Sequence, residues 1–180
     1  GRINQAARFY YERYESGGQR DRISFSNSEI NRLTNDFTLA AWIKPLTLVE
    51  GFDHTILSTG ECNESGFRFY LDGAELRLAT NRVNDYASGF ELAEGRWAHV
   101  AVVLDGANDA TFYVNGQQVG EGTHTEPAIQ DSYNPLLIGA EVCGGGSPGA
   151  YFDGAMDDLT IFRRSLSASE VQELYREAAI

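Results

Sequence analysis

The sequence is poor in proline, methionine and cysteine, and it has no long apolar run. Only 4 prolines, 1 methionine and 2 cysteines occur in 180 residues. No apolar stretch reaches the roughly 18 residues that a membrane-spanning helix needs, which excludes such a helix. The N-terminus also lacks the cationic and apolar segments of a signal peptide. We therefore expect any export signal to have been removed or to lie on a longer parent chain.

Basic residues are scarce as well. The 14 Lys and Arg residues stand against 26 Asp and Glu residues, which gives a formal net charge of −12. Nucleic-acid phosphates and anionic lipid surfaces repel a chain of this charge. We therefore expect no nucleic-acid partner and no membrane insertion. The acidic residues are dispersed along the chain, which is typical of a solubilising surface.

Strand-forming and turn-forming residues are abundant by contrast. Aromatic residues make up 12% of the chain, apolar residues 42%, and there are 19 glycines. This composition is typical of an all-β domain with many turns. The chain is long enough to bury one sizeable core, and no repeat or low-complexity linker divides it. We predict a single domain over residues 1–180.

Local patterns predict several short strands and one helix. Hairpins are expected at Asp72-Gly73 and Asn115-Gly116, because these pairs tolerate the backbone conformations of tight turns. The nearly continuous apolar run 96–104 indicates a strand buried on both faces. A capping-box pattern at 167–170 precedes apolar residues at helical spacing and predicts a short C-terminal helix. The expected fold is an antiparallel two-sheet sandwich.

Five motifs in order resemble those of laminin-G-like jelly-roll domains. They lie at residues 21–45, 56–60, 95–101, 113–116 and 152–167, the last reading FDGAMDDLTIFRRSLS. The resemblance covers residues 21–175, and residues 10–20 depart from it as an inserted loop. It implies an all-β, concanavalin A-like jelly roll. Members of this superfamily are mostly non-catalytic carbohydrate-binding or adhesion modules of secreted multidomain proteins.

The resemblance therefore implies a lectin-like module that binds a polysaccharide or glycan outside the cell, as part of a larger multidomain protein. The alternative is a protein-interaction, adhesion or spacer domain that binds no sugar. Glycoside hydrolysis needs two carboxylates held at a defined separation. Hydrolases of this fold carry them in an alternating run on one strand, and no such run occurs here. His54, His99 and His124 lie in no lyase-like motif, and His99 is expected to pack in the core. We predict no enzymatic activity.

Loop aromatics beside amides and acids fit the chemistry of sugar recognition. The loops at 60–66, 81–89, 131–134 and 141–151 are expected to form a ligand rim. Tyr86 or Tyr133 would provide the stacking ring, whereas Trp42 and Trp97 are expected in the core. The polar ligand-binding residues would be Asn63, Glu64, Asn84 and Glu141. The alternative interpretation is that these loops are ordinary polar connections.

Pentraxins, which share this fold, hold calcium and ligand between two facing loops. Cys62 and Cys143 occupy the corresponding loops, which implies a disulfide; the alternative is two free thiols. Glu141 stands where pentraxins have a calcium-binding Glu, but Cys143 stands about where they have an Asp. Asp157 stands where hydrolases of this fold often have a structural calcium ligand. Calcium needs six to eight oxygens, so backbone carbonyls and a second acid would have to contribute. The alternative is that Asp157 only hydrogen-bonds the opposite strand.

Overall fold

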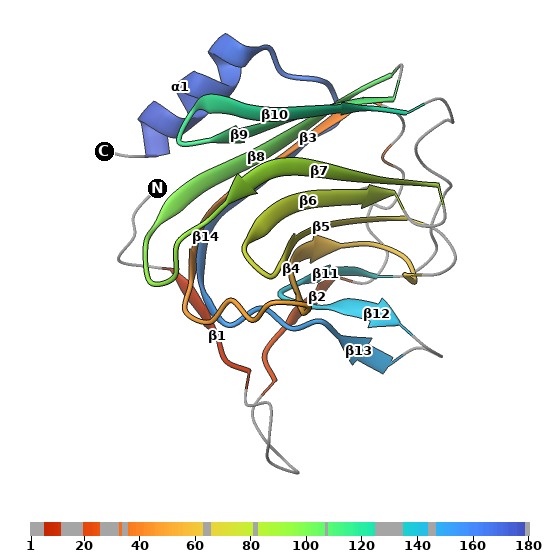
Figure 1. Cartoon of the computed structure of the whole chain (residues 1–180), viewed down its shortest axis with the longest axis vertical. Helices are drawn as coiled ribbons and strands as arrows, with labels where there is room; N and C mark the ends of the chain where they lie inside the picture. The colour runs from red at the N-terminus through yellow and green to blue at the C-terminus, as the bar shows by residue number, and fades with distance from the viewer. Residues whose placement is uncertain are drawn as a thin grey trace.

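The protein is described here from a computed structural model. Placement is defined for residues 6–11, 20–25, 33, 36–62, 66–80, 83–106, 108–124, 135–143 and 147–178. Two six-stranded antiparallel sheets form the molecule (Figure 1). Sheet I has the order β1 (Ala7–Phe9), β14 (Gly154–Phe162), β3 (Phe37–Pro45), β8 (Ala98–Asp105), β9 (Asp109–Val114) and β10 (Gln117–Thr123).

Sheet II completes the sandwich. Its order is β2 (Ile23–Phe25), β11 (Leu136–Ile138), β4 (Asp53–Ser58), β5 (Phe67–Asp72), β6 (Glu75–Thr80) and β7 (Asn84–Glu91). A small hairpin of β12 (Glu141–Cys143) and β13 (Ser147–Gly149) projects beside β4, as Figure 1 shows. The antiparallel jelly-roll sandwich predicted from the sequence is confirmed.

Both predicted hairpin turns are confirmed. Gly73 joins β5 to β6 with a φ of 56°, and Asn115 and Gly116 join β9 to β10 with φ values of 51° and 74°. Asn and Gly tolerate this left-handed conformation, so the turn residues fix the register of each hairpin. In the second hairpin, Val114 pairs with Gln117.

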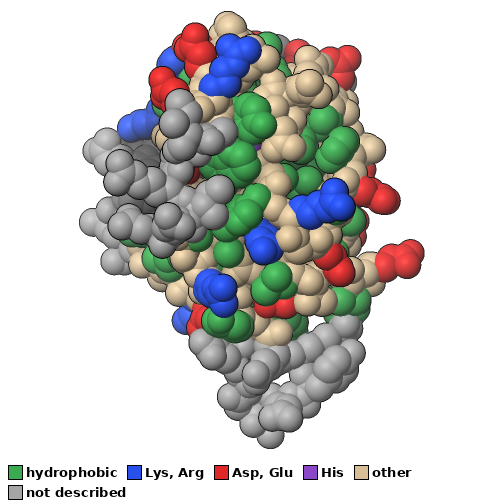
Figure 2. Space-filling view, turned by 90° about the vertical axis from the view of Figure 1, so that its left-hand side faces the viewer, with side chains coloured by type: hydrophobic (Ala, Val, Ile, Leu, Met, Phe, Trp, Pro, Cys, Tyr) green, Lys and Arg blue, Asp and Glu red, His purple; other side chains and the backbone are tan. Residues whose placement is uncertain are grey.

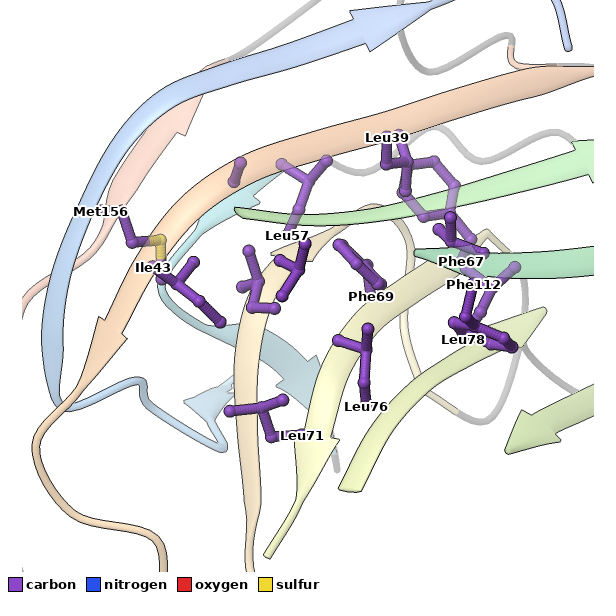
Figure 3. Packing of buried hydrophobic residues seen from close by; sticks show 14 of the residues in the cluster. Leu39, Ile43, Leu57, Phe67, Phe69, Leu71, Leu76, Leu78, Phe112 and Met156 are labelled. Carbon is purple, nitrogen blue, oxygen red and sulfur yellow. The ribbon is translucent and has the colours of Figure 1, made fainter. Parts of the chain in front are cut away.

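The core lies between the two sheets. Leu39 and Ile43 from β3 point toward Phe69 and Leu76 from sheet II, with Met156 of β14 at one end (Figure 3). Each of these side chains is no more than 3% exposed. At about 25 cal/mol per Å², this burial is the main favourable contribution to folding.

The predicted C-terminal helix is α1 (Ala168–Ala178), which covers the outer face of sheet I. Its capping box is confirmed. The Ser167 backbone N–H donates to Glu170 Oε2 at 2.8 Å, and the Glu170 N–H donates to Ser167 Oγ at 3.4 Å. Val171 of α1 and the preceding Leu166 pack on Ala101 and Tyr113, which form a second, smaller core.

The edges of the two sheets meet where β10 lies against β7. Gly120 in β10 approaches β7 so closely that a Cβ atom there would collide with the backbone of Ser88. Two residues away in β7, the Tyr86 ring packs edge-on against His124, with ring centroids 4.6 Å apart. The sandwich is therefore closed along this side by small residues and one buried ring.

The surface is charged but mixed. On the side shown in Figure 2, acidic and basic side chains are interspersed with hydrophobic and uncharged ones. Within the described part of the chain, no helix is long and apolar enough to cross a membrane. Most of the stretch 10–20, expected as an inserted loop, lies outside the described residues; its ends Tyr11 and Arg20 form an antiparallel bridge.

Candidate functional site

A cavity of about 670 Å³ lies at one end of the sandwich, between the segment that joins β3 to β4 and the segment that precedes β14. We call it the tyrosine pocket. Three stretches distant in the sequence meet here. The lining residues are Tyr11, Thr47, Val49, Gly51, Phe52, Asp53, His54, Ala150, Tyr151 and Asp153.

Three aromatic rings line the tyrosine pocket. Tyr11 stacks on Tyr151 with ring centroids 5.7 Å apart and an angle of 17° between the planes. Tyr151 is 7% exposed, and its buried ring packs against the half-buried Tyr11. Phe52 is 43% exposed, so part of its ring faces solvent at the pocket.

Polar groups in the tyrosine pocket are held in place by local hydrogen bonds. The Thr47 hydroxyl donates to Asp153 Oδ2 at 2.7 Å. The Val49 N–H donates to His54 Nε2 at 3.2 Å, so the neutral ring carries its proton on Nδ1. Burial lowers the pKa of His54, against the opposing effects of a backbone hydrogen bond to Tyr151 and of nearby carboxylates. The imidazole is therefore uncharged at neutral pH.

Arg68 connects the tyrosine pocket to the β12–β13 hairpin. Its Nη1 atom lies 2.6 Å from Asp53 Oδ2 and 2.8 Å from Glu141 Oε1. The guanidinium also stacks over the Tyr70 ring, 3.7 Å from its centroid. Burial raises the pKa of Glu141, although the charge of Arg68 opposes this shift. Arg68 thus ties β4, β5 and the hairpin together.

The predicted disulfide is confirmed. Cys62 and Cys143 are bonded, with their Cα atoms 5.2 Å apart, and the Cys62 N–H donates to the Val142 carbonyl at 2.9 Å. Beside it lies a smaller hollow of about 280 Å³, which we call the disulfide pocket. It is lined by Cys62, Arg68, Ala79, Thr80, Val83, Asn84 and Asp85.

Two of the predicted ligand residues lie around Arg68. Asn84 lines the disulfide pocket together with Arg68, and Glu141 binds the same guanidinium while being only 6% exposed. Asn63, Glu64 and Tyr133 lie outside the described residues, so their roles stay predictions.

The prediction that Tyr86 provides an exposed stacking ring is wrong. Residues 84–91 form β7 rather than a loop, and the Tyr86 ring is 1% exposed within the core. Its hydroxyl donates to the Asn108 carbonyl at 3.2 Å, which anchors the ring inward. A ring buried in this way has no face for a sugar.

Asp157 lies at a bulge in β14, opposite Trp42 of β3. Its Oδ1 accepts the Asp158 N–H at 2.9 Å, and its buried Oδ2 has no hydrogen-bond partner among the described residues. This orphaned oxygen could serve as a metal ligand. However, the part of the chain that the structure describes contains no group of three His, Cys, Asp or Glu side chains arranged to hold a metal. Calcium at Asp157 stays a prediction.

The core histidine predicted at position 99 is confirmed. His99 is 3% exposed and lies next to Trp42, with ring centroids 5.6 Å apart. Burial lowers its pKa to about 4, and Asp158 opposes the shift. Trp42 is likewise buried, whereas Trp97 precedes β8 and is half-buried, so the expectation of a core strand position fails for that residue.

The sequence interpretation missed most of the tyrosine pocket. Tyr11 fell in the stretch treated as an insertion, and Phe52 and Asp53 were given no role. One local signal was present: Phe52 directly follows the turn at Glu50 and Gly51, just before β4 begins at Asp53.

The two-sheet scaffold, with an aromatic-lined hollow at one end, has the architecture of a jelly roll. Residues 17–172 match the family model of the laminin-G type described as the concanavalin A-like lectin/glucanases superfamily, and the chain belongs to this superfamily.

Solved structures and a curated relative share the fold. Domain 4 of AbnA, an extracellular arabinanase from Geobacillus stearothermophilus solved with arabinotriose, has a TM-score of 0.73 and 20% identity over 97% of this chain and 78% of that one. The CBM40 domain of a Ruminococcus gnavus sialidase, bound to α2,3-sialyllactose, has a TM-score of 0.68 and 14% identity over 87% and 97%.

One curated relative is the adhesion G-protein coupled receptor V1 of Danio rerio, 23% identical over 164 residues. The alignment covers 83% of this chain but spans only 2% of that receptor's length. The domain family and the disulfide fit an extracellular location, where such bonds persist.

Proposed function

We propose that this domain is a non-catalytic carbohydrate-binding module of an extracellular multidomain protein, and that it binds glycan in the tyrosine pocket. The observation that carries the proposal is the pairing of the stacked Tyr11 and Tyr151 rings and exposed Phe52 with oriented carboxylates. Sugar C–H faces pack on aromatic rings, while carboxylates accept hydrogen bonds from hydroxyls. Two structural neighbours that bind oligosaccharides support this reading by analogy.

The pocket's two carboxylates argue for binding rather than hydrolysis. A glycosidase needs one carboxyl group free to give a proton and another free to attack or to activate water. Asp53 Oδ2 is held by Arg68, and Asp153 Oδ2 accepts the Thr47 hydroxyl. We expect no release of reducing ends from plant, algal or animal polysaccharides, and turnover that disappears in Asp53→Asn or Asp153→Asn would contradict this part of the proposal.

A glycan array followed by calorimetric titration tests the proposed site. Tyr11→Ala and Phe52→Ala should each weaken binding of the best glycan by roughly 5- to 150-fold, equal to about 1–3 kcal/mol for loss of a stacking ring. Tyr10→Ala is the matched control, because Tyr10 is 41% exposed but does not line the pocket. Wild-type affinity in both folded pocket variants would place the site elsewhere.

Protein recognition is a second candidate function. Strand β2 lies at the edge of sheet II and exposes Ile23 at 40% and Phe25 at 47%. Apolar edge strands can pair with a partner strand. A blank glycan array together with a purified protein partner whose binding is lost in Phe25→Ser would favour this function over sugar binding.

A further inference from the structure

The tyrosine pocket has a one-sided charge. Asp53 and Asp153 are its two ionisable carboxylates, and its described lining residues include no Lys or Arg. The remaining ionisable group that could be cationic, His54, is kept neutral at pH 7 by burial. A bound ligand therefore meets carboxylates, a hydroxyl, a neutral imidazole and aromatic rings.

Arg68, the cation that pairs with Asp53, is held away from a ligand by its other contacts. Arg68 shares one nitrogen between Asp53 and Glu141, and its side chain is only 14% exposed. The same guanidinium is stacked on Tyr70. Arg68 and its two carboxylates together carry one net negative charge, and Asp153 adds another. The field at the pocket is thus negative, in a chain whose formal net charge is −12.

We propose, building on the proposed function, that the tyrosine pocket selects uncharged and amino saccharides and rejects acidic ones, such as uronates and sialosides, with Asp53 and Asp153 as the selecting residues. Uncharged sugars donate hydroxyl hydrogen bonds to these carboxylates, and an ammonium group gains a charge pair. A sugar carboxylate within a few ångströms of Asp153 meets a like charge, while the single charge of Arg68 is shared between Asp53 and Glu141. This would separate the domain from the sialyllactose-binding neighbour of the same fold.

The test compares acidic or amino saccharides with their uncharged counterparts. An array carries oligogalacturonate and its neutral methyl ester, sialyllactose and lactose, and chitin oligomers with their de-N-acetylated forms. At low salt, we expect each acidic member to bind at least about tenfold more weakly than its neutral counterpart. We also expect the ratio to shrink at 0.5 M salt, where charges are screened.

The outcomes separate the two proposals. Acidic members that bind as tightly as neutral ones, with affinity lost in Tyr11→Ala, would overturn the charge selectivity while sugar binding stands. No binding to any member or to any other glycan on the array would overturn the proposed function and the selectivity together.

Matched substitutions localise the effect. Asp153→Asn keeps an oxygen that can accept the Thr47 hydroxyl and removes the charge. It should improve binding of the acidic member about tenfold while changing the neutral member less than threefold. Asp105→Asn is the control, because Asp105 is exposed at the end of β8 and outside the pocket. Equal relaxation in both variants would assign the effect to net charge and overturn the role of Asp153.

Discussion

The two sheets have contrasting outer faces. On sheet I, the rings of Trp42, His99 and Tyr175 gather under α1 with centroids 5.6–6.0 Å apart. On sheet II, Arg68 and Tyr70 point outward from β5 and join charged side chains through hydrogen bonds. One face is sealed by packing and the other is held by ion pairs.

The contrast shows why the two faces differ in the room that they leave for a ligand. A face covered by a helix adds buried apolar area, which stabilises the sandwich but leaves no room for a ligand. A face built from fixed charges keeps polar groups in defined positions near solvent, although their partial desolvation costs free energy. The predictions below test how each face contributes to the stability of the sandwich that carries the tyrosine pocket.

The largest effect is expected on the sealed face. Trp42→Ala should lower the free energy of unfolding by about 3–5 kcal/mol, because it removes a buried ring that packs on His99 and Tyr175. Urea unfolding measures the loss. Trp97→Ala is the control and should cost less, since Trp97 is half-buried. Equal losses would break the comparison.

The disulfide lies beside Arg68, so its removal tests how much the charged face of sheet II depends on it for stability. Replacing Cys62 and Cys143 together with serine should cost about 4 kcal/mol, because the bond closes a loop with a sequence separation of 81 and so restricts the unfolded chain. Thermal unfolding with and without reductant measures this. Reduced wild-type protein should match the double variant, and a loss below about 1 kcal/mol would contradict the prediction.

Stability measured as a function of pH tests the role of His99 on the helix-covered face of sheet I. The folded pKa of His99, about 4, lies below its unfolded value of 6.5. The unfolded state therefore binds the proton more readily between these values, and stability falls as the pH falls through this window. The loss due to His99 should be about 2 kcal/mol at pH 5.

The His99→Gln variant removes this titrating group and should reduce the pH dependence between pH 6.5 and 4, leaving the part due to His54, whose pKa burial also lowers. His124→Gln is the control, since His124 lies against β7 rather than beneath α1. An unchanged slope in His99→Gln would mean that another group carries the acid sensitivity.

The smallest effect concerns calcium. If Asp157 holds calcium in the folded state, calcium at ten times its dissociation constant should stabilise the domain by about 1.4 kcal/mol through mass action. Differential scanning calorimetry after chelation and re-addition measures the shift, which Asp157→Ala should abolish. No shift in the wild-type protein would remove the calcium site and leave Asp157 as a strand residue beside Trp42.

Sequence reasoning succeeded where the signal was local. The pair Asn115-Gly116 specifies a turn, and Ser167 with Glu170 specifies a helix start, whatever the rest of the chain does. The disulfide needed a resemblance to a known fold, because its cysteines are 81 residues apart.

The site was less accessible to sequence reasoning, because its parts are polar and far apart. Tyr86 lies among Asn, Asp and Ser residues that favour loops, yet β7 pairs with β6 and turns its ring inward. The tyrosine pocket forms only when Tyr11, Phe52 and Tyr151 are brought together by sheet pairing. No local sequence pattern predicts that these three rings lie close together.

The close approach of Gly120 to β7 has a consequence for association between molecules. The outermost strands of two sheets normally present unpaired N–H and C=O groups that invite a second chain to add on. Here β7 and β10 lie against each other along the side where both sheets end. A larger residue at position 120 would push these strands apart and uncover two templates for intermolecular pairing. The missing side chain at position 120 thus keeps these two edge strands together and closes this side of the sandwich, whereas β2 remains an exposed edge.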